Sequence, residues 1–420
     1  NQLEAREQIE IMSPVGSFES LMAAIQGGAN AVYFGAGKHN MRSRSSVNFT
    51  LSDLNDISRI CKEKGIRSYL TLNSIIYDEE LQEMQNIIDT ARESGVSAII
   101  ASDPAVINYA VEKGIEVHLS TQCNVTNIEA VKWYSRYADV VVLARELNLQ
   151  QIKQIVDAIK TYDIRGPSGD LVAIEVFVHG ALCMAISGKC YLSLHTMNSS
   201  ANKGACLQIC RRRYDVTDKE TGTVLEVDNE YIMSPKDLCT IGILDQILAA
   251  GVKILKIEGR GRSPEYVKTV TQVYHEGVEA VLNKTFTQEK VAKWTERLRT
   301  VYNRGFWEGY YLGRELGEWT QQHGSQATIK KQYLGKVLNY FSKLGVAEVK
   351  LETNDLKIGD KYSINGPTSG VVEGTIEEIR LEYDKIPLAP KGRICSFKVS
   401  APVRRGDKVF LLIENPQSLI

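Results

Sequence analysis

Short apolar runs alternate with amphipathic stretches between residues 9 and 257, and this alternation constrains the fold more than any other feature. The runs are short and rich in β-branched residues, as the buried strands of parallel sheets are. We expect strands at Ile9–Met12, Ala31–Phe34, Tyr69–Leu72, Ala98–Ile100, Glu116–Leu119, Val140–Leu143, Ala173–Val178, Tyr231–Met233 and Lys253–Ile257.

The stretches between these runs have the apolar spacing of helices. Several end in a glycine just before the next run, as at Gly65, Gly95 and Gly114, which is typical of a helix end that turns into a strand. Alternation repeated about eight times predicts an α/β fold, a (β/α)8 TIM-like barrel. An open doubly wound sheet is the alternative, but no glycine-rich phosphate-binding motif follows the first run.

The pattern changes near Gln332, where alternating apolar and polar residues are separated by Gly, Pro, Asn and Asp turns. We therefore expect two domains. Residues 1–320 form the barrel, and residues 332–420 form a small all-β barrel. Residues 305–317 and 319–331 are expected to link them.

The 420 residues carry a formal net charge of −1, so the overall balance favours no nucleic acid, membrane or acidic partner. A local basic patch can still bind RNA. No apolar run approaches the roughly 20 residues that a bilayer requires, and the polar stretch Asn1 to Glu10 does not resemble a signal peptide. The sequence predicts a cytoplasmic protein with no membrane partner.

Five of the eight cysteines lie close together in the sequence: Cys183, Cys190, Cys206, Cys210 and Cys239. In a long intracellular chain such clustering indicates metal or redox chemistry. Four thiolates on consecutive loops suit a [4Fe–4S] cluster or a tetrahedral zinc ion, although the spacing matches neither a zinc ribbon nor a ferredoxin. The alternative is that these are reduced cysteines packed in loops, as we expect for Cys61 and Cys395 in the core; for Cys123 both interpretations stay open.

Polar residues follow the ends of several predicted strands. Active sites of (β/α)8 barrels form at this end, from the loops that follow the strands. The residues expected to act there in catalysis are His179, Glu258, Arg260 and Arg145, and Asn73 and Gln122 are further candidates for contacting a substrate.

The stretch from Glu175 to Ser193, with His179-Gly180, Cys183, Gly188 and Cys190, resembles the signature of the collagenase-like peptidase family U32. Further matching motifs are Glu10–Gly16, Gly28–Gly35, Arg211–Tyr214, Ser234–Leu238 and Lys256–Arg260. Bacterial members of this family include tRNA hydroxylation proteins, which help to form 5-hydroxyuridine at the wobble position, and relatives carry [4Fe–4S] clusters.

The resemblance implies an iron–sulfur enzyme of oxygen-independent hydroxylation that acts on tRNA with a small-molecule hydroxyl donor of unknown identity. It implies Cys183, Cys190 and Cys206 as cluster ligands. The fourth is Cys239 or Cys210, and we expect Cys239 because it follows the next predicted strand end. The run Arg211-Arg212-Arg213 is then a candidate phosphate contact.

Two other functions compete with this one. The family label implies a peptidase, but neither His-Glu-x-x-His nor Gly-x-Ser-x-Gly occurs, so only a Cys–His arrangement is left. A non-catalytic metal-containing scaffold that binds RNA through the β domain is the third hypothesis. It predicts the cysteines without a convergent polar pocket.

Overall fold

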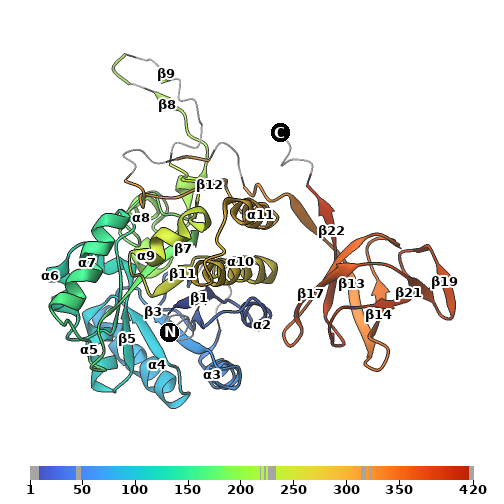
Figure 1. The fold of residues 1–420 in the computed structure, drawn as a ribbon, viewed down its shortest axis with the longest axis horizontal. Helices are drawn as coiled ribbons and strands as arrows, with labels where there is room; N and C mark the ends of the chain where they lie inside the picture. The colour runs from blue at the N-terminus through green and yellow to red at the C-terminus, as the bar shows by residue number, and fades with distance from the viewer. Residues whose placement is uncertain are drawn as a thin grey trace.

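The computed structural model describes residues 9–43, 49–217, 219–221, 224–225, 233–313, 318–320 and 324–415. It consists of a helix-covered barrel and a separate all-β unit beside it, as Figure 1 shows. The predicted run at 231–233 lies mostly outside the described residues.

Eight parallel strands form a closed barrel, which confirms the predicted fold. The ring closes because the last strand pairs with both the first and the seventh. The barrel strands are β1 (Glu10–Pro14), β2 (Ala31–Gly35), β3 (Arg67–Leu72), β4 (Ala98–Ala101), β5 (Glu116–Leu119), β6 (Val140–Val142), β7 (Ala173–Gly180) and β11 (Ile254–Ile257).

Helices surround the barrel, and their sequences explain where they begin and which face they bury. Asp103 caps α5 by accepting from the backbone N–H of Ala105, and Pro104 occupies the first turn. On α4, Met84, Ile87, Ile88 and Ala91 are buried, which is the spacing of one helix face. The helices are α2 (Phe18–Gln26), α3 (Leu54–Glu63), α4 (Leu81–Glu93), α5 (Pro104–Glu112), α6 (Ile128–Tyr134), α7 (Leu149–Thr161), α8 (Leu192–Met197), α9 (Leu244–Ala249), α10 (Pro264–Leu282) and α11 (Gln288–Arg299).

The ring closes directly between β7 and β11, so the segment between them contributes no strand to it. The described residues after 233 form β10 (Asp237–Cys239), which runs antiparallel to the end of β7 and parallel to β12 (Phe306–Trp307). It extends the barrel sheet at its rim and is not one of the eight strands of the ring. Phe306 and Trp307, at the start of the segment expected to be a linker, are therefore part of the barrel sheet.

The C-terminal unit is an antiparallel sheet of eight strands around its own apolar core. Among the described residues its end strands, β17 and β19, are not hydrogen-bonded to each other. Its strands are β13 (Ile329–Phe341), β14 (Val346–Leu351), β16 (Lys361–Gly366), β17 (Gly370–Thr375), β18 (Ile379–Leu381), β19 (Asp384–Ile386), β21 (Ile394–Lys398) and β22 (Lys408–Glu414), with a small pair formed by β15 (Leu356–Lys357) and β20 (Leu388–Ala389).

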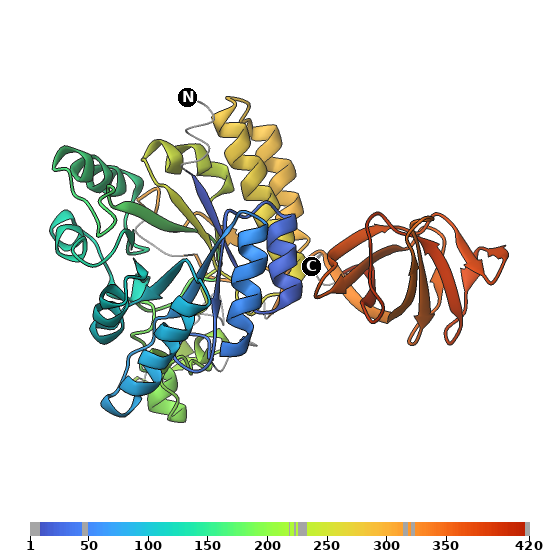
Figure 2. The same ribbon diagram turned by 90° about the horizontal axis from the view of Figure 1, so that it is seen from below.

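The β unit docks on α2 and α10 of the barrel, as Figure 2 shows. Gln26 on α2 donates to the carbonyl of Ser369 at 2.9 Å and accepts from the N–H of Val371 at 3.0 Å. Lys268 on α10 donates to the carbonyl of Val371 at 2.9 Å. These bonds come from rigid elements on both sides, so they set the position of the sheet relative to the barrel.

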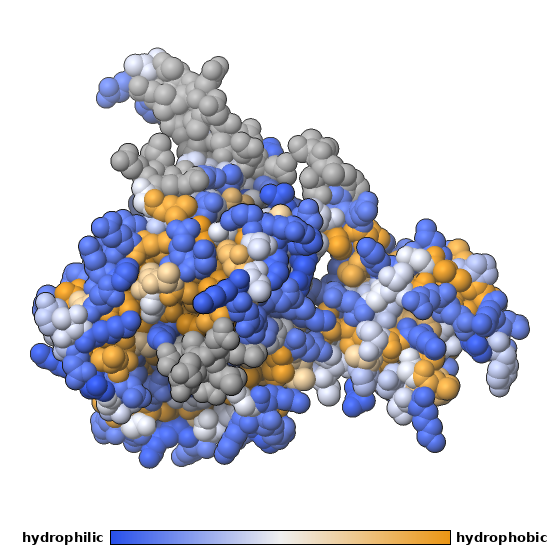
Figure 3. Space-filling model, viewed as in Figure 1, coloured by the Kyte–Doolittle hydropathy of each residue, from blue (hydrophilic) through white to orange (hydrophobic). Residues whose placement is uncertain are grey.

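The face seen in Figure 3 is largely polar over both units, with apolar side chains between the charged ones. Among the described residues, none of the helices combines the length and the apolar character that crossing a bilayer requires.

Candidate functional site

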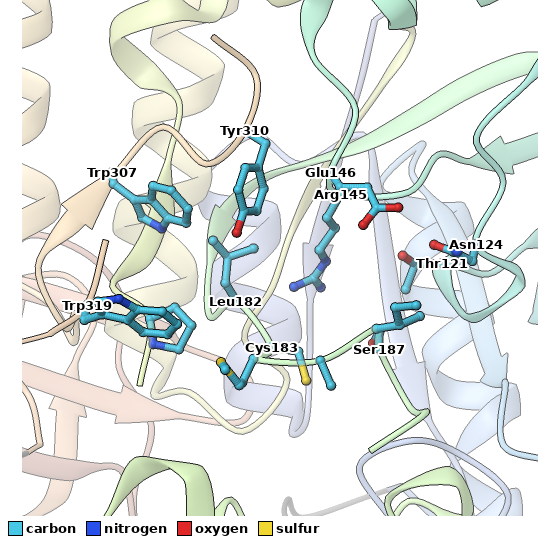
Figure 4. A pocket seen from close by; sticks show the side chains of 14 residues that line it. Thr121, Asn124, Arg145, Glu146, Leu182, Cys183, Ser187, Trp307, Tyr310 and Trp319 are labelled. Carbon is cyan, nitrogen blue, oxygen red and sulfur yellow. The ribbon is translucent and has the colours of Figure 1, made fainter. Parts of the chain in front are cut away.

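Two neighbouring cavities lie where the loops leave the carboxyl ends of the barrel strands. One has a volume of about 160 Å³ and reaches into the barrel mouth. The other, of about 420 Å³, is shown in Figure 4. Both are lined by Thr121, Arg145 and the loop residues Leu182, Cys183, Met184 and Ser187, so this loop separates them.

Four cysteines line the smaller cavity: Cys183, Cys190, Cys206 and Cys210. Cys183 lies in the loop after β7, and Cys190 lies just before α8. Cys206 and Cys210 follow in the next loop, where Cys210 belongs to a short 3-10 turn, Ile209–Arg211. The pKa of the Cys210 thiol is raised by burial and by the three other thiols, while Arg211 opposes this. The thiol of Cys210 is therefore close enough to the other three for their charge to affect its ionisation.

Backbone N–H groups already point at two of these sulfur atoms. The N–H of Leu192 donates to Cys190 Sγ at 3.5 Å, and that of Gln208 donates to Cys206 Sγ at 3.4 Å. Such bonds favour the thiolate, which is the form that binds metal. Ser193 Oγ lies 4.0 Å from Cys206 Sγ.

These four cysteines therefore have the chemical type and the number of ligands that a [4Fe–4S] cluster or a zinc ion bound by four thiolates requires. In the described part of the chain, however, no three His, Cys, Asp or Glu side chains are close enough together to hold a metal ion. The loops would have to draw the thiols inward around a cluster.

Cys239 lies elsewhere and does not line the cavity. It ends β10 opposite His179 and is 8% exposed. Burial raises its pKa to about 12, although the Ile241 backbone and the Tyr274 hydroxyl act against this. Because β10 runs antiparallel to β7, the strand runs back from the barrel mouth and ends opposite His179. The structure thus groups Cys210, and not Cys239, with the other three.

Glu258 and Arg260 lie at the cavity, as their position after the last strand predicts. Glu258 accepts from Arg42 Nη2 at 2.7 Å and from the Tyr33 hydroxyl at 3.3 Å. Burial opposes its ionisation, but Arg42, Arg145 and Arg260 lower its pKa to about 2, so it is a carboxylate. Arg260 donates to Asn40 Oδ1 at 3.0 Å and Thr71 Oγ1 at 2.8 Å, and burial lowers its pKa to about 10.

Arg145 lies between the two cavities. Its guanidinium stacks over the ring of Phe177 at 3.9 Å and donates to the carbonyl of Ala181 at 3.1 Å. Its Nε is buried and has no hydrogen-bond partner within the described residues. Asn73 and Gln122 also line the smaller cavity, where Asn73 Nδ2 lies 3.4 Å from Gln122 Oε1.

His179 belongs to β7 and lines neither cavity. A bulge where β7 pairs with Ile257 turns its side chain outward toward α10. Its Nδ1 lies 3.4 Å from the Tyr274 hydroxyl, and burial lowers its pKa to about 3. The ring is therefore neutral near pH 7 and does not line the cavity that contains the four cysteines.

Several residues of the cavity were not predicted from the sequence: Arg42, Lys256, Arg262 and Arg304. Lys256 had a signal, since it is the charged residue within the otherwise apolar strand segment Ile254–Ile257. Arg211 donates to Ser234 Oγ at 3.1 Å and to the Pro235 carbonyl at 3.0 Å, and its contact with a phosphate stays a prediction. It joins two loops of the site.

Comparison with known proteins agrees with the resemblance seen in the motifs. The model of peptidase family U32 matches residues 16–321. A protein named collagenase from Porphyromonas gingivalis is 56% identical over 96% of this chain and 97% of its own. A tRNA hydroxylation protein P1 from Bacillus subtilis is 33% identical over 88% of this chain and 86% of its own.

A third relative is the 23S rRNA 5-hydroxycytidine C2501 synthase of Escherichia coli, which is 34% identical over 66% of this chain and 40% of its own length. The relatives thus bear the names of RNA hydroxylation proteins and of a protease. Because the family model covers most of the chain and the first relative matches nearly all of it, the chain belongs to peptidase family U32.

Proposed function

We propose that this chain is an iron–sulfur enzyme of oxygen-independent RNA hydroxylation that forms 5-hydroxyuridine at the tRNA wobble position. The observation that carries the proposal is the meeting of Cys183, Cys190, Cys206 and Cys210 at one cavity in the barrel mouth. Relatives named for the hydroxylation of tRNA and rRNA support the choice of substrate.

These four cysteines would hold a [4Fe–4S] cluster, with Cys210 in place of Cys239. When bound, such a cluster supplies one-electron redox chemistry or a Lewis-acidic iron. Zinc is the alternative metal for four thiolates. The backbone N–H groups at Cys190 and Cys206 stabilise the charge of the ligands.

The residues around the cysteines prepare a polar, positively charged site. Six arginines line the smaller cavity together with the carboxylate of Glu258: Arg42, Arg145, Arg211, Arg260, Arg262 and Arg304. Lys256 also lines it, but its charge is paired with Glu175, and Arg304 lies 3.6 Å from Asp237. Since Glu258 is held ionised by its arginine neighbours, it orients their guanidinium groups and accepts no proton near pH 7. The remaining positive charge attracts the phosphates of RNA or an anionic hydroxyl donor.

Peptidase activity is the second candidate, because a relative that is 56% identical is named collagenase. A cysteine peptidase needs a histidine within reach of its thiol. The candidate, His179, is buried against α10 and lines neither cavity, and the cysteine opposite it, Cys239, is buried with its pKa raised to about 12. The geometry therefore supports this function less well than the first.

The deciding experiment measures modified nucleosides and metal in parallel. We expect tRNA from a deletion strain to lack 5-hydroxyuridine by mass spectrometry, and the cloned gene to restore it. Protein prepared without oxygen should contain iron and sulfide at about four each per chain.

Unchanged 5-hydroxyuridine in the deletion strain, together with gelatin cleavage by metal-free protein, would replace this proposal with the peptidase. A zinc-loaded protein with no effect on tRNA would favour the RNA-binding scaffold.

A further inference from the structure

We infer that the 420 Å³ cavity beside Cys183 is the subsite for an unpaired pyrimidine base of the RNA substrate. The inference rests on the proposed function and names the residues that would hold the base. A base inside a paired helix cannot reach a barrel mouth, so the enzyme must bind it unpaired or flipped out.

The cavity has an aromatic wall and a polar wall that face each other, as Figure 4 shows. Trp307, Tyr310 and Trp319 form the aromatic wall. The polar wall opposite includes Arg145 and Glu146, and Leu182 and Cys183 lie between the two walls. A flat ring with a polar edge matches this arrangement, since its face stacks on one wall and its edge meets the other.

The aromatic wall is held in place before any ligand arrives. Trp307 belongs to β12, and its indole N–H donates to the carbonyl of Lys236 at 3.2 Å. The rings of Trp307 and Tyr310 pack edge to face, with centroids 5.3 Å apart. Trp319 is fixed by a backbone bridge to Pro235. Rings positioned in this way lose little conformational freedom when a base stacks on them.

The polar wall offers both kinds of hydrogen-bonding group. The guanidinium of Arg145 lines the cavity, and its buried Nε has no hydrogen-bond partner within the described residues, so this side chain is a donor for a base carbonyl. The carboxylate of Glu146, which is exposed, is an acceptor for a ring N–H. The edge of uracil carries two carbonyl oxygens on either side of an N–H and so needs both.

Charge favours RNA over a peptide in this subsite. Six arginines line the adjoining cavity, with Glu258 and the Asp237 partner of Arg304 as the counter-charges, and Arg145 belongs to both cavities. This excess attracts the phosphates on either side of a bound base. A proline-rich peptide could stack on the same rings but would gain nothing from the cations. The shared loop also places the base next to Cys183, which is one of the proposed cluster ligands.

The test replaces one ring of the wall and compares two RNAs. The probes are short single-stranded RNAs with the anticodon-loop sequence, one with uridine and one with an abasic residue at the wobble position. We expect Trp319→Ala to weaken binding of the uridine RNA about tenfold and to leave binding of the abasic RNA unchanged, because only the stacking on the base is lost. The iron content should stay the same.

Trp133→Ala is the matched control, since Trp133 is half exposed on α6 and lines neither cavity. It should bind both RNAs like the unsubstituted protein. Equal affinity of the unsubstituted protein for the two RNAs, or an equal loss for both in Trp319→Ala, would overturn the subsite. So would a proline-rich collagen peptide that competes with the uridine RNA and loses affinity in Trp319→Ala.

Failure of the subsite and failure of the proposed function give different results. If the subsite is wrong, Trp319→Ala still restores 5-hydroxyuridine in the deletion strain as well as the Trp133→Ala control does. If the function is wrong, the deletion strain keeps its 5-hydroxyuridine, whatever the binding assay shows.

Discussion

At the scale of single residues, the barrel interior contains a buried ion pair. Lys256 Nζ donates to Glu175 Oε1 at 2.6 Å, and the two side chains are 6% and 0% exposed. Removing one partner of such a pair leaves a buried charge without compensation, which costs roughly 3–5 kcal/mol. We expect Glu175→Ala to lower the free energy of unfolding by about this amount in urea titrations.

The double variant Glu175→Leu with Lys256→Met is the control, because it removes both charges and keeps the volume apolar. It should recover most of the stability lost in Glu175→Ala. If Glu175→Ala unfolds at the same urea concentration as the unsubstituted protein, the pair is not desolvated as described.

His179 makes stability depend on pH. Burial lowers its pKa from 6.5 to about 3, so in acid the unfolded chain takes up a proton that the folded chain does not. The stability from this group is complete above pH 6.5 and is lost as the pH falls toward 3, by about 5 kcal/mol in total. We expect His179→Gln to unfold less steeply with acid between pH 6.5 and 3, as followed by circular dichroism. An identical acid profile would contradict the buried neutral ring.

At the scale of elements, the positions of the loop after β7 and of the loop before β10 determine which cysteines line the same cavity. Cys210 is on the loop that lines the cavity, whereas Cys239 ends an antiparallel strand that points away from it. We expect Cys183→Ser, Cys190→Ser, Cys206→Ser and Cys210→Ser each to lose the cluster, measured as iron per chain and visible absorbance after anaerobic preparation.

Cys239→Ser is the matched control, because it changes a cysteine of the same sequence cluster outside the cavity. It should keep full iron content, with only a modest loss of stability from its buried position. Full iron in Cys210→Ser combined with loss of iron in Cys239→Ser would restore the ligand set expected from the sequence.

At the scale of the whole molecule, Gly370 lies where the β unit docks on the barrel. Its φ is +64°, and a Cβ atom there would meet Gln26 Oε1 at 2.5 Å. Gln26 would have to move and release both of its bonds to the sheet. We expect Gly370→Ala to separate the two units in part, seen as a larger radius of gyration in solution X-ray scattering and an additional early thermal transition.

Gly392→Ala is the matched control, since Gly392 also has a positive φ, +84°, but no atom lies within 4 Å of an added Cβ. It should cost about 1 kcal/mol from backbone strain alone and leave the scattering unchanged. The same scattering change in both variants would mean that local strain, and not docking, is the cause.

The sequence by itself determined the barrel. Buried strands that alternate with amphipathic helices leave a local pattern in the sequence, and only a few folds can accommodate that pattern. It also determined that the β unit is a separate antiparallel sheet, and that Glu258 and Arg260 face the barrel mouth, since residues after parallel strands meet at one end. The thiols of Cys183, Cys190 and Cys206 lie at the same mouth for the same reason.

Only the tertiary structure decided which further residues share that mouth. The direction of β10 cannot be read from its composition, and its antiparallel pairing with β7 removes Cys239 from the cavity. The bulge that turns His179 outward depends on the register between β7 and β11. Trp307 and Trp319 form a wall beside Cys183 because pairing with residues 235–238 brings them there, and such long-range pairing leaves no local pattern in the sequence.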